Sequence, residues 1–150
     1  LNVASYVLDM IYTKTIREDQ GGTYGVGTAL QGRRRPSARI DVHVLFSTNP
    51  EAAEKLTGIA IDELKKYAQN GPTDEQFAKA MENMKKNLPE KRINNGYWMN
   101  ALNHYYEYGE DYDKLYEEAI NSLTAEDIKN VLQAILAEGN FIEVTLTPEK

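Results

Sequence analysis

Apolar residues at the start of the chain recur at helical spacing. Val3, Val7, Met10 and Ile11 fall three or four positions apart and so share one helix face. The same stretch holds four further apolar side chains, Tyr6, Leu8, Tyr12 and Ile16. The pattern predicts a helix from Asn2 to about Asp19 that is buried on more than one side.

The next stretch alternates between apolar and polar positions. Tyr24, Val26 and Leu30 are placed on one face of a strand, and a turn follows at 32–36. Apolar positions then alternate with polar ones through Ala38, Ile40, Val42, Val44 and Phe46. We therefore expect strands at 23–31 and 37–46, paired as an antiparallel hairpin with one buried face.

Helical patterns fill most of the remaining chain. Asn49-Pro50-Glu51 predicts one helix start, and Gly71-Pro72 predicts its end. Thr73 with Gln76, and Thr124 with Asp127, open two later helices. Pro89 should kink or end the first of these. Residues 97–116 hold six of the ten tyrosines and should form one or two helices broken near Gly109.

The end of the chain again alternates like a strand. Gly139-Asn140 should end the last helix, and 141–147 should form a strand closed by Pro148. The order predicts an α+β fold, with an antiparallel or mixed sheet covered by helices on one face. We expect 1–150 to be a single domain cut from a longer protein, with a further strand missing upstream of Leu1. The sheet edge left open could pair between copies.

Composition limits the classes of partner and binding site that the chain can have. Apolar residues make up 41% of the chain and the net charge is −6, which disfavours nucleic acid as a partner. No apolar run reaches the length of about 20 residues that a membrane helix needs. The chain has no cysteine, so disulfides and thiolate metal sites are excluded. This is compatible with either cytosol or periplasm.

The junction between the first helix and the first strand carries the candidate chemistry. Arg17 falls in the last expected helical turn, where a cation suits the negative end of the helix dipole. Gly21 and Gly22 permit a sharp corner, and Tyr24 follows it. A cation and a phenol seven positions apart are thereby held near each other.

The order of these landmarks resembles a known family. A helix ending in Ile16-Arg17-Glu18, a glycine corner and then Thr23-Tyr24-Gly25-Val26 resembles the C-terminal homologous half of the insulinase-type zinc metallopeptidases. That family includes pitrilysin and the mitochondrial processing peptidase, and belongs to the inverzincins. Further landmarks in matching order are 47–51, 71–76, 123–128 and 142–149, and the stretch 94–98 resembles bacterial members in particular.

The resemblance implies a divided active site. Zinc would be bound by an N-terminal half that carries His-x-x-Glu-His, on the same chain or on a partner subunit. The C-terminal half would bind no metal. It would supply Tyr24, which donates to the developing oxyanion, and Arg17, which with Tyr24 holds the peptide substrate. The resemblance slightly favours the periplasm, and this chain alone should be inactive.

Plainer interpretations stay open. Arg17 could be only a helix-terminal cation and Tyr24 only a sheet aromatic. His43 and His104 are expected to be ordinary surface or packing residues, although His104 and Glu107 share a helix face. Arg33-Arg34-Arg35 is expected to be a solvated hairpin tip, or else a contact for an acidic partner. The tyrosines should pack helices, with a peptide groove as the alternative. The same fold could also serve as a non-catalytic scaffold, and a free-standing interaction module is a third possibility.

Overall fold

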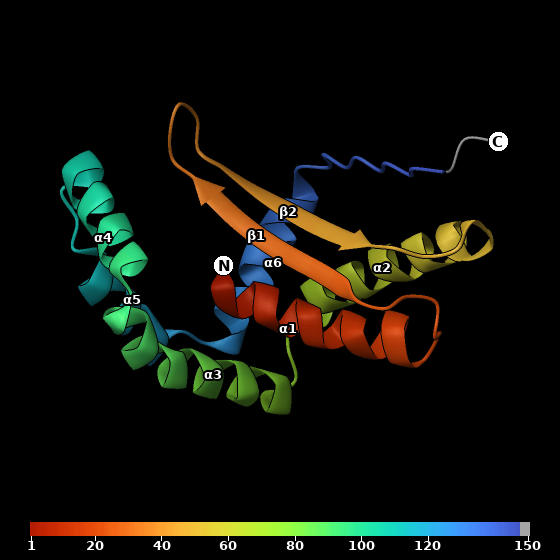
Figure 1. Cartoon of the computed structure of the whole chain (residues 1–150), viewed down its shortest axis with the longest axis horizontal. Coiled ribbons are helices and arrows are strands. Elements are labelled where there is room, and N and C mark those ends of the chain that lie inside the picture. Colours follow the sequence, from red (N-terminus) through yellow and green to blue (C-terminus); the bar gives the residue numbers. More distant parts are fainter. Residues whose placement is uncertain (148–150) are drawn as a thin grey trace.

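The computed structural model describes residues 1–147 and shows an α+β fold in which helices pack on one face of a small sheet (Figure 1). A helical segment opens the chain, a hairpin follows, and five helices complete the described part. The elements in order are α1 (Asn2–Tyr12), η1 (Thr13–Glu18), β1 (Val26–Arg33), β2 (Arg39–Phe46), α2 (Pro50–Asn70), α3 (Asp74–Ile93), α4 (Asn95–Tyr108), α5 (Tyr112–Ser122) and α6 (Ala125–Ala137).

The hairpin pairs antiparallel as the sequence predicts, with Val26 opposite Phe46 and Leu30 opposite Val42. Its buried face lies on α1 (Figure 1). Thr28 makes the main polar contact between β1 and α1. Its backbone N–H donates to Asp9 Oδ1 at 3.0 Å, and its hydroxyl bonds to the same carboxylate. A polar pair on the inner face thus fixes how the strand sits on the helix.

The core is centred on α1 and η1, the segment with the widest apolar stripe. Val7, Leu8, Tyr12 and Ile16 are fully buried there. Tyr12 donates its hydroxyl to the Ala60 carbonyl at 2.8 Å, which ties α1 to α2. Burial is the main cause that raises the pKa of Tyr12.

Most of the predicted helix boundaries are confirmed. The side chain of Asn49 accepts from the Ala52 N–H, and Thr73 with Gln76 and Thr124 with Asp127 form reciprocal capping boxes. Gly109 ends α4 at φ 72°, so the tyrosine-rich stretch is two helices, as expected. Pro89 does not end its helix, since α3 continues to Ile93. Buried Met84 and Leu88 anchor the turns that precede the proline.

The strand expected at 141–147 is not formed. In the described part of the chain the sheet consists of β1 and β2 alone, in antiparallel order, so it is not mixed. Phe141, Ile142, Val144 and Leu146 are exposed along this extended segment. Alternation indicates strand propensity, but a strand also needs a neighbour for its backbone hydrogen bonds. Pro148 lies outside the described residues.

Arg92, at the end of α3, holds α5 in place. Its guanidinium donates to both carboxylate oxygens of Asp113 at 2.8 Å, and also to Glu117 at 2.6 Å. Tyr97 of α4 donates to the same Asp113 carboxylate at 2.7 Å. The carboxylate of Asp113, on α5, therefore links α5 to both α3 and α4.

We expect this junction to weaken in acid. The Arg92 guanidinium, and then the Tyr97 hydroxyl, hold the pKa of Asp113 below its ordinary value. A carboxylate with a lowered folded-state pKa stabilises the fold above its unfolded pKa of about 3.9 and stops doing so as the pH falls through the folded value. Asp113→Asn should lower Tm at pH 7. The difference in Tm between this variant and the parent should shrink below pH 4. A constant difference in thermal melts across this range would contradict the assignment.

Candidate functional site

The helix that leads to the candidate site changes its winding before it ends. Thr13–Glu18 forms a π-helical segment continuous with α1, and the Asp19 N–H donates to the Lys14 carbonyl five residues back, at 2.9 Å. Such segments are rare and frequently occur at functional sites. Arg17 lies in the last turn of this segment and is exposed, whereas its neighbour Ile16 is fully buried.

The corner after Arg17 is held tightly against α2. Gly21 takes φ 60° and donates to the Arg17 carbonyl at 3.1 Å. A Cβ on Gly22 would lie 2.8 Å from Cδ1 of buried Leu56, so only glycine fits without movement. Thr48 donates its hydroxyl to the Gly22 carbonyl at 2.6 Å. Gly21 therefore turns the chain as expected, whereas Gly22 has no positive φ and instead allows close packing, which the sequence did not predict.

Tyr24 stands clear of the fold. Its exposed fraction is 101%, and β1 begins only at Val26, so the expected place of Tyr24 on the buried strand face is wrong. Thr23 causes the difference, since its hydroxyl donates to the Gly25 carbonyl at 2.9 Å and makes a local turn before the strand. The packed sheet aromatic considered for Tyr24 is thereby excluded.

Neither candidate side chain is bonded to another side chain in the described part of the chain. Within residues 1–147, Arg17 and Tyr24 have no side-chain hydrogen bond or ion pair. A guanidinium offers five donors and a phenol one, and a carbonyl oxygen or an oxyanion is a fitting acceptor for both. The corner thus presents donors that no side chain among residues 1–147 uses.

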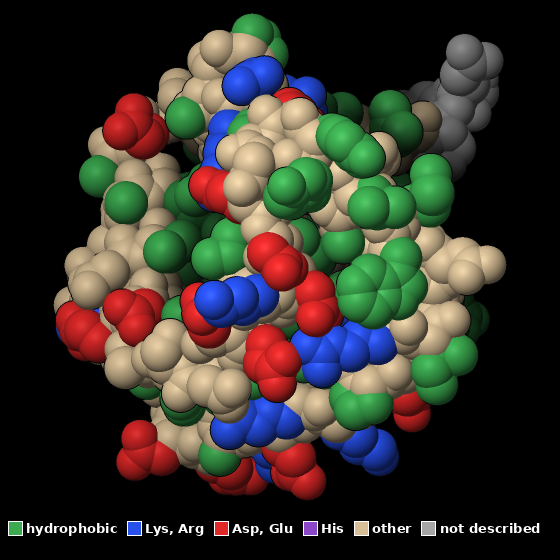
Figure 2. Space-filling view, turned by 90° about the vertical axis from the view of Figure 1, so that its left-hand side faces the viewer, with side chains coloured by type: hydrophobic (Ala, Val, Ile, Leu, Met, Phe, Trp, Pro, Cys, Tyr) green, Lys and Arg blue, Asp and Glu red, His purple; other side chains and the backbone are tan. Residues whose placement is uncertain are grey.

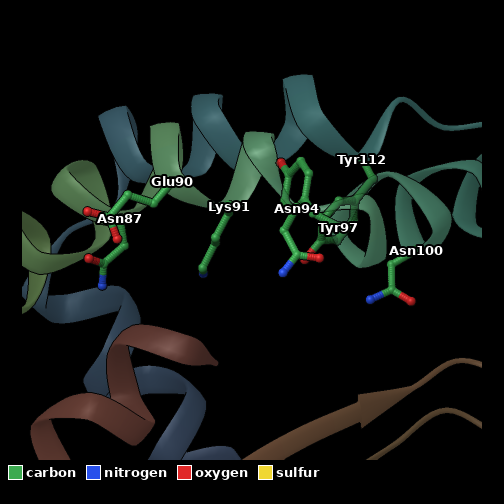
Figure 3. A pocket seen from close by; sticks show the side chains of 7 residues that line it. All are labelled: Asn87, Glu90, Lys91, Asn94, Tyr97, Asn100 and Tyr112. Atoms are coloured by element: carbon green, nitrogen blue, oxygen red, sulfur yellow. The ribbon is translucent and has the colours of Figure 1, made fainter.

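A second concave region lies on the other side of the molecule, at the inner face of α3, α4 and α5. It has a volume of about 600 Å³ and is lined by Asn87, Glu90, Lys91, Asn94, Tyr97, Asn100 and Tyr112. In Figure 3 the side chains of Asn87 and Lys91 point from α3 into the open space. Two of the clustered tyrosines thus line a groove. The signal in the sequence is the polar spacing 87, 90, 91 and 94 on one helix face.

The hairpin tip makes contacts that the sequence did not reveal. Arg34 pairs with Glu110 at 2.8 Å, across 76 positions, and lies 5.0 Å from the ring centre of Tyr108. Arg33 pairs instead with Asp41 at 3.5 Å. The tip is therefore partly engaged by the α4–α5 turn rather than only solvated.

The histidines sit as the plain interpretation expects. His43 is exposed on β2. His104 contacts Glu110 at 3.0 Å rather than forming a pair with Glu107, and packs against Tyr108 and Tyr112. Residues 1–147 bring together no group of three His, Cys, Asp or Glu side chains that could hold a metal ion. Over the same range, no helix is long and apolar enough to cross a membrane.

Comparison with known proteins finds similarity among solved structures. No family model and no curated protein sequence matches the chain. Among solved structures, the chain is similar to the periplasmic protease PqqL from Escherichia coli, with a TM-score of 0.73 and 18% sequence identity. The match covers 90% of this chain but only 15% of PqqL. The chain therefore shares its fold with a segment of a larger protease.

Proposed function

We propose that this chain is the C-terminal, non-metal half-domain of a zinc metalloendopeptidase of the insulinase type. The observation that carries the proposal is the corner itself: Arg17 and Tyr24 are exposed and held on a braced turn. A tyrosine kept only for packing would be buried, whereas Tyr24 is fully exposed. The fold that the chain shares with part of a protease agrees with this proposal.

In this proposal Tyr24 is the oxyanion donor. Its neutral phenol donates to the scissile carbonyl oxygen as negative charge develops there. The donor stabilises the transition state best when its position is fixed before reaction. The backbone that precedes Tyr24 is held at Gly22, which lies against Leu56 and accepts a hydrogen bond from Thr48.

Arg17 binds the substrate in the same proposal. Its guanidinium donates to backbone carbonyls beside the scissile bond, which exist equally in the bound ground state. Interactions of that kind contribute to substrate affinity more than to the chemical step.

The metal belongs to the other half. Residues 1–147 bring together no set of three side chains that could hold zinc, so in this proposal the chain supplies no metal ligand. In the complete enzyme zinc would polarise the peptide and activate water. A partner half, on the same chain or another, would bind it and face the Arg17–Tyr24 corner. This chain alone would be inactive, and the periplasm is the favoured compartment.

Arg17→Ala tests the binding role. In the complete enzyme we expect KM to rise by about tenfold or more while kcat falls much less, because the lost contacts are present in the bound substrate. Arg17→Lys keeps the charge but loses the planar fork, so it should recover only part of the affinity. Steady-state cleavage of a peptide series measures both constants. Unchanged KM in Arg17→Ala would leave Arg17 as a helix-terminal cation, and the non-catalytic scaffold would then gain support.

A further inference from the structure

α4 is connected to its neighbours by a short non-helical link at each end. Asn94, at φ −86° and ψ 126°, is the single residue between α3 and α4. Gly109, at φ 72°, ends α4, and α5 begins only at Tyr112. Residues at the ends of helices are the usual hinges that absorb backbone rotation when one element moves relative to another. The two links therefore give α4 a hinge position at each end.

α4 also contributes no residue to the buried core. It is the one α-helix among residues 1–147 without a buried side chain. Its two neighbours in the sequence are anchored, since α3 buries Met84 and Leu88 and α5 buries Ile120. Elements with few buried apolar contacts open at a lower free energy than the core does. Movement of α4 therefore disturbs the core less than movement of any other α-helix in this part of the chain.

The near end of α4, beside Asn94, is bonded to the end of α3 and to α5. Trp98 donates its indole N–H to the Arg92 carbonyl at 2.7 Å. Tyr97 donates its hydroxyl to Asp113 at 2.7 Å. Both donors lie in the first turn of α4. Rotation at Asn94 therefore moves the far end of the helix more than the near end.

The far end of α4 is held by the hairpin tip. Arg34 pairs with Glu110 at 2.8 Å and lies 5.0 Å from the ring centre of Tyr108. Arg35 lies 5.5 Å from the same ring centre, and His104 contacts Glu110 at 3.0 Å. We name four of these residues the clasp: Arg34, Arg35, Tyr108 and Glu110. Figure 1 places the hairpin loop beside the end of α4, and Figure 2, which looks onto this side, shows basic and acidic side chains near its upper end.

The clasp is weak enough to open while the core stays folded. The side chains of Arg34 and Glu110 are 57% and 37% exposed. Ion pairs this exposed contribute little to stability and are screened by salt. Tyr108 is only half-buried and Arg35 is exposed. Separation of the hairpin tip from α4 therefore uncovers no part of the hydrophobic core.

α4 also forms part of the wall of the groove described above. Among the residues that line the groove, Tyr97 and Asn100 belong to α4, whereas Asn87, Glu90 and Lys91 belong to α3 (Figure 3). The width of the groove thus depends on where α4 lies relative to α3. Outward movement of the far end of α4 widens it.

We propose that α4 is a strap beside this groove and that the clasp holds the strap closed. In the closed form, which the structure shows, Arg34 and Arg35 hold Tyr108 and Glu110. In the open form the clasp is broken, α4 turns about Asn94 and the groove widens. Salt favours the open form because it screens the ion pair. This device is independent of the role proposed for the corner at residues 17–24.

Distances between two spin labels on the 150-residue chain test the proposal. The chain has no cysteine, so Ser37→Cys in the hairpin loop and Asn103→Cys on α4 provide the only two thiols, both at exposed positions. Double electron–electron resonance should give a main short distance and a minor longer one. Arg34→Ala should raise the ratio of long to short distances by about fivefold, because it removes the ion pair and one cation–π contact. The matched control Arg33→Ala loses only its pair with Asp41 inside the hairpin and should leave the ratio unchanged.

Salt tests the clasp without changing the clasp itself. Added sodium chloride should raise the ratio of long to short distances in the labelled parent, and should raise it much less in Arg34→Ala, which has already lost the ion pair. Circular dichroism should show the same helix content in every variant. An equal ratio in Arg34→Ala and Arg33→Ala would overturn the proposal. So would a parent ratio that salt leaves unchanged, because α4 would then be fixed by its other contacts, such as that of His104 with Tyr112.

Discussion

Tyr24→Phe is expected to lower kcat of the complete enzyme by about 10²–10³-fold, the usual cost of removing one oxyanion-hole donor. In this structure the substitution removes the hydroxyl without disturbing packing or internal hydrogen bonds. The side chain is fully exposed, so the phenyl ring loses no packing, and the hydroxyl has no hydrogen bond within residues 1–147. KM should change little, because the proposed bond forms as charge develops on the carbonyl oxygen.

Two measurements separate this result from a structural effect. Thermal melts and zinc content of Tyr24→Phe should equal those of the parent enzyme. Tyr6→Phe, which removes a hydroxyl from a half-buried tyrosine of α1, serves as the matched control and should keep full kcat. Cleavage at the parent rate by Tyr24→Phe would remove the catalytic case for the corner. Loss of activity together with a lowered Tm would make Tyr24 a structural residue.

Local signals predicted most of the backbone. Capping residues placed the starts of α2, α3 and α6, because a cap acts within three or four positions of itself. The glycine corner was also predictable, since Gly21 supplies the positive φ that a sharp turn needs. The π-helical winding before it was not, because the apolar pattern of α and π segments is nearly the same over one turn.

The orientation of Tyr24 could not be predicted from alternation. Tyr24 and Val26 are two positions apart, which in a strand places both on one face. The strand starts at Val26, and the local hydrogen bonds of Thr23 with Gly25 decide where Tyr24 lies. Side-chain competition of this kind shifts element boundaries without changing the periodic pattern.

Contacts between residues far apart in the sequence could not be predicted either. Arg34 meets Glu110 and Arg92 meets Asp113, yet nothing in the spacing of these residues selects the partner. The segment 141–147 shows the converse error. Its alternation is strand-like, but no strand among the described residues pairs with it. Propensity is a local property, whereas pairing depends on which surface the fold brings near.

Leu56→Ala is expected to lower the free energy of unfolding by about 2–5 kcal/mol, the range for truncating a leucine in a well-packed core. Leu56 is 1% exposed and contacts the corner at Gly22. Its loss removes apolar contacts and leaves space beneath the turn that carries Tyr24. Urea unfolding followed by circular dichroism measures the change.

The same variant tests whether the core supports the site. The side chain of Leu45 is exposed on β2, so Leu45→Ala is the matched control and should change stability by no more than about 0.5 kcal/mol. Amide hydrogen exchange at Gly21, whose N–H donates to the Arg17 carbonyl, should quicken in Leu56→Ala more than exchange in α6 does, because only the corner loses its direct support. At temperatures well below Tm, kcat of the complete enzyme should also be lower in Leu56→Ala than in the parent. The reason is that an oxyanion donor on a looser turn is less well positioned. Uniformly faster exchange with unchanged kcat would show that Leu56 stabilises the fold as a whole and that the corner keeps its shape without it.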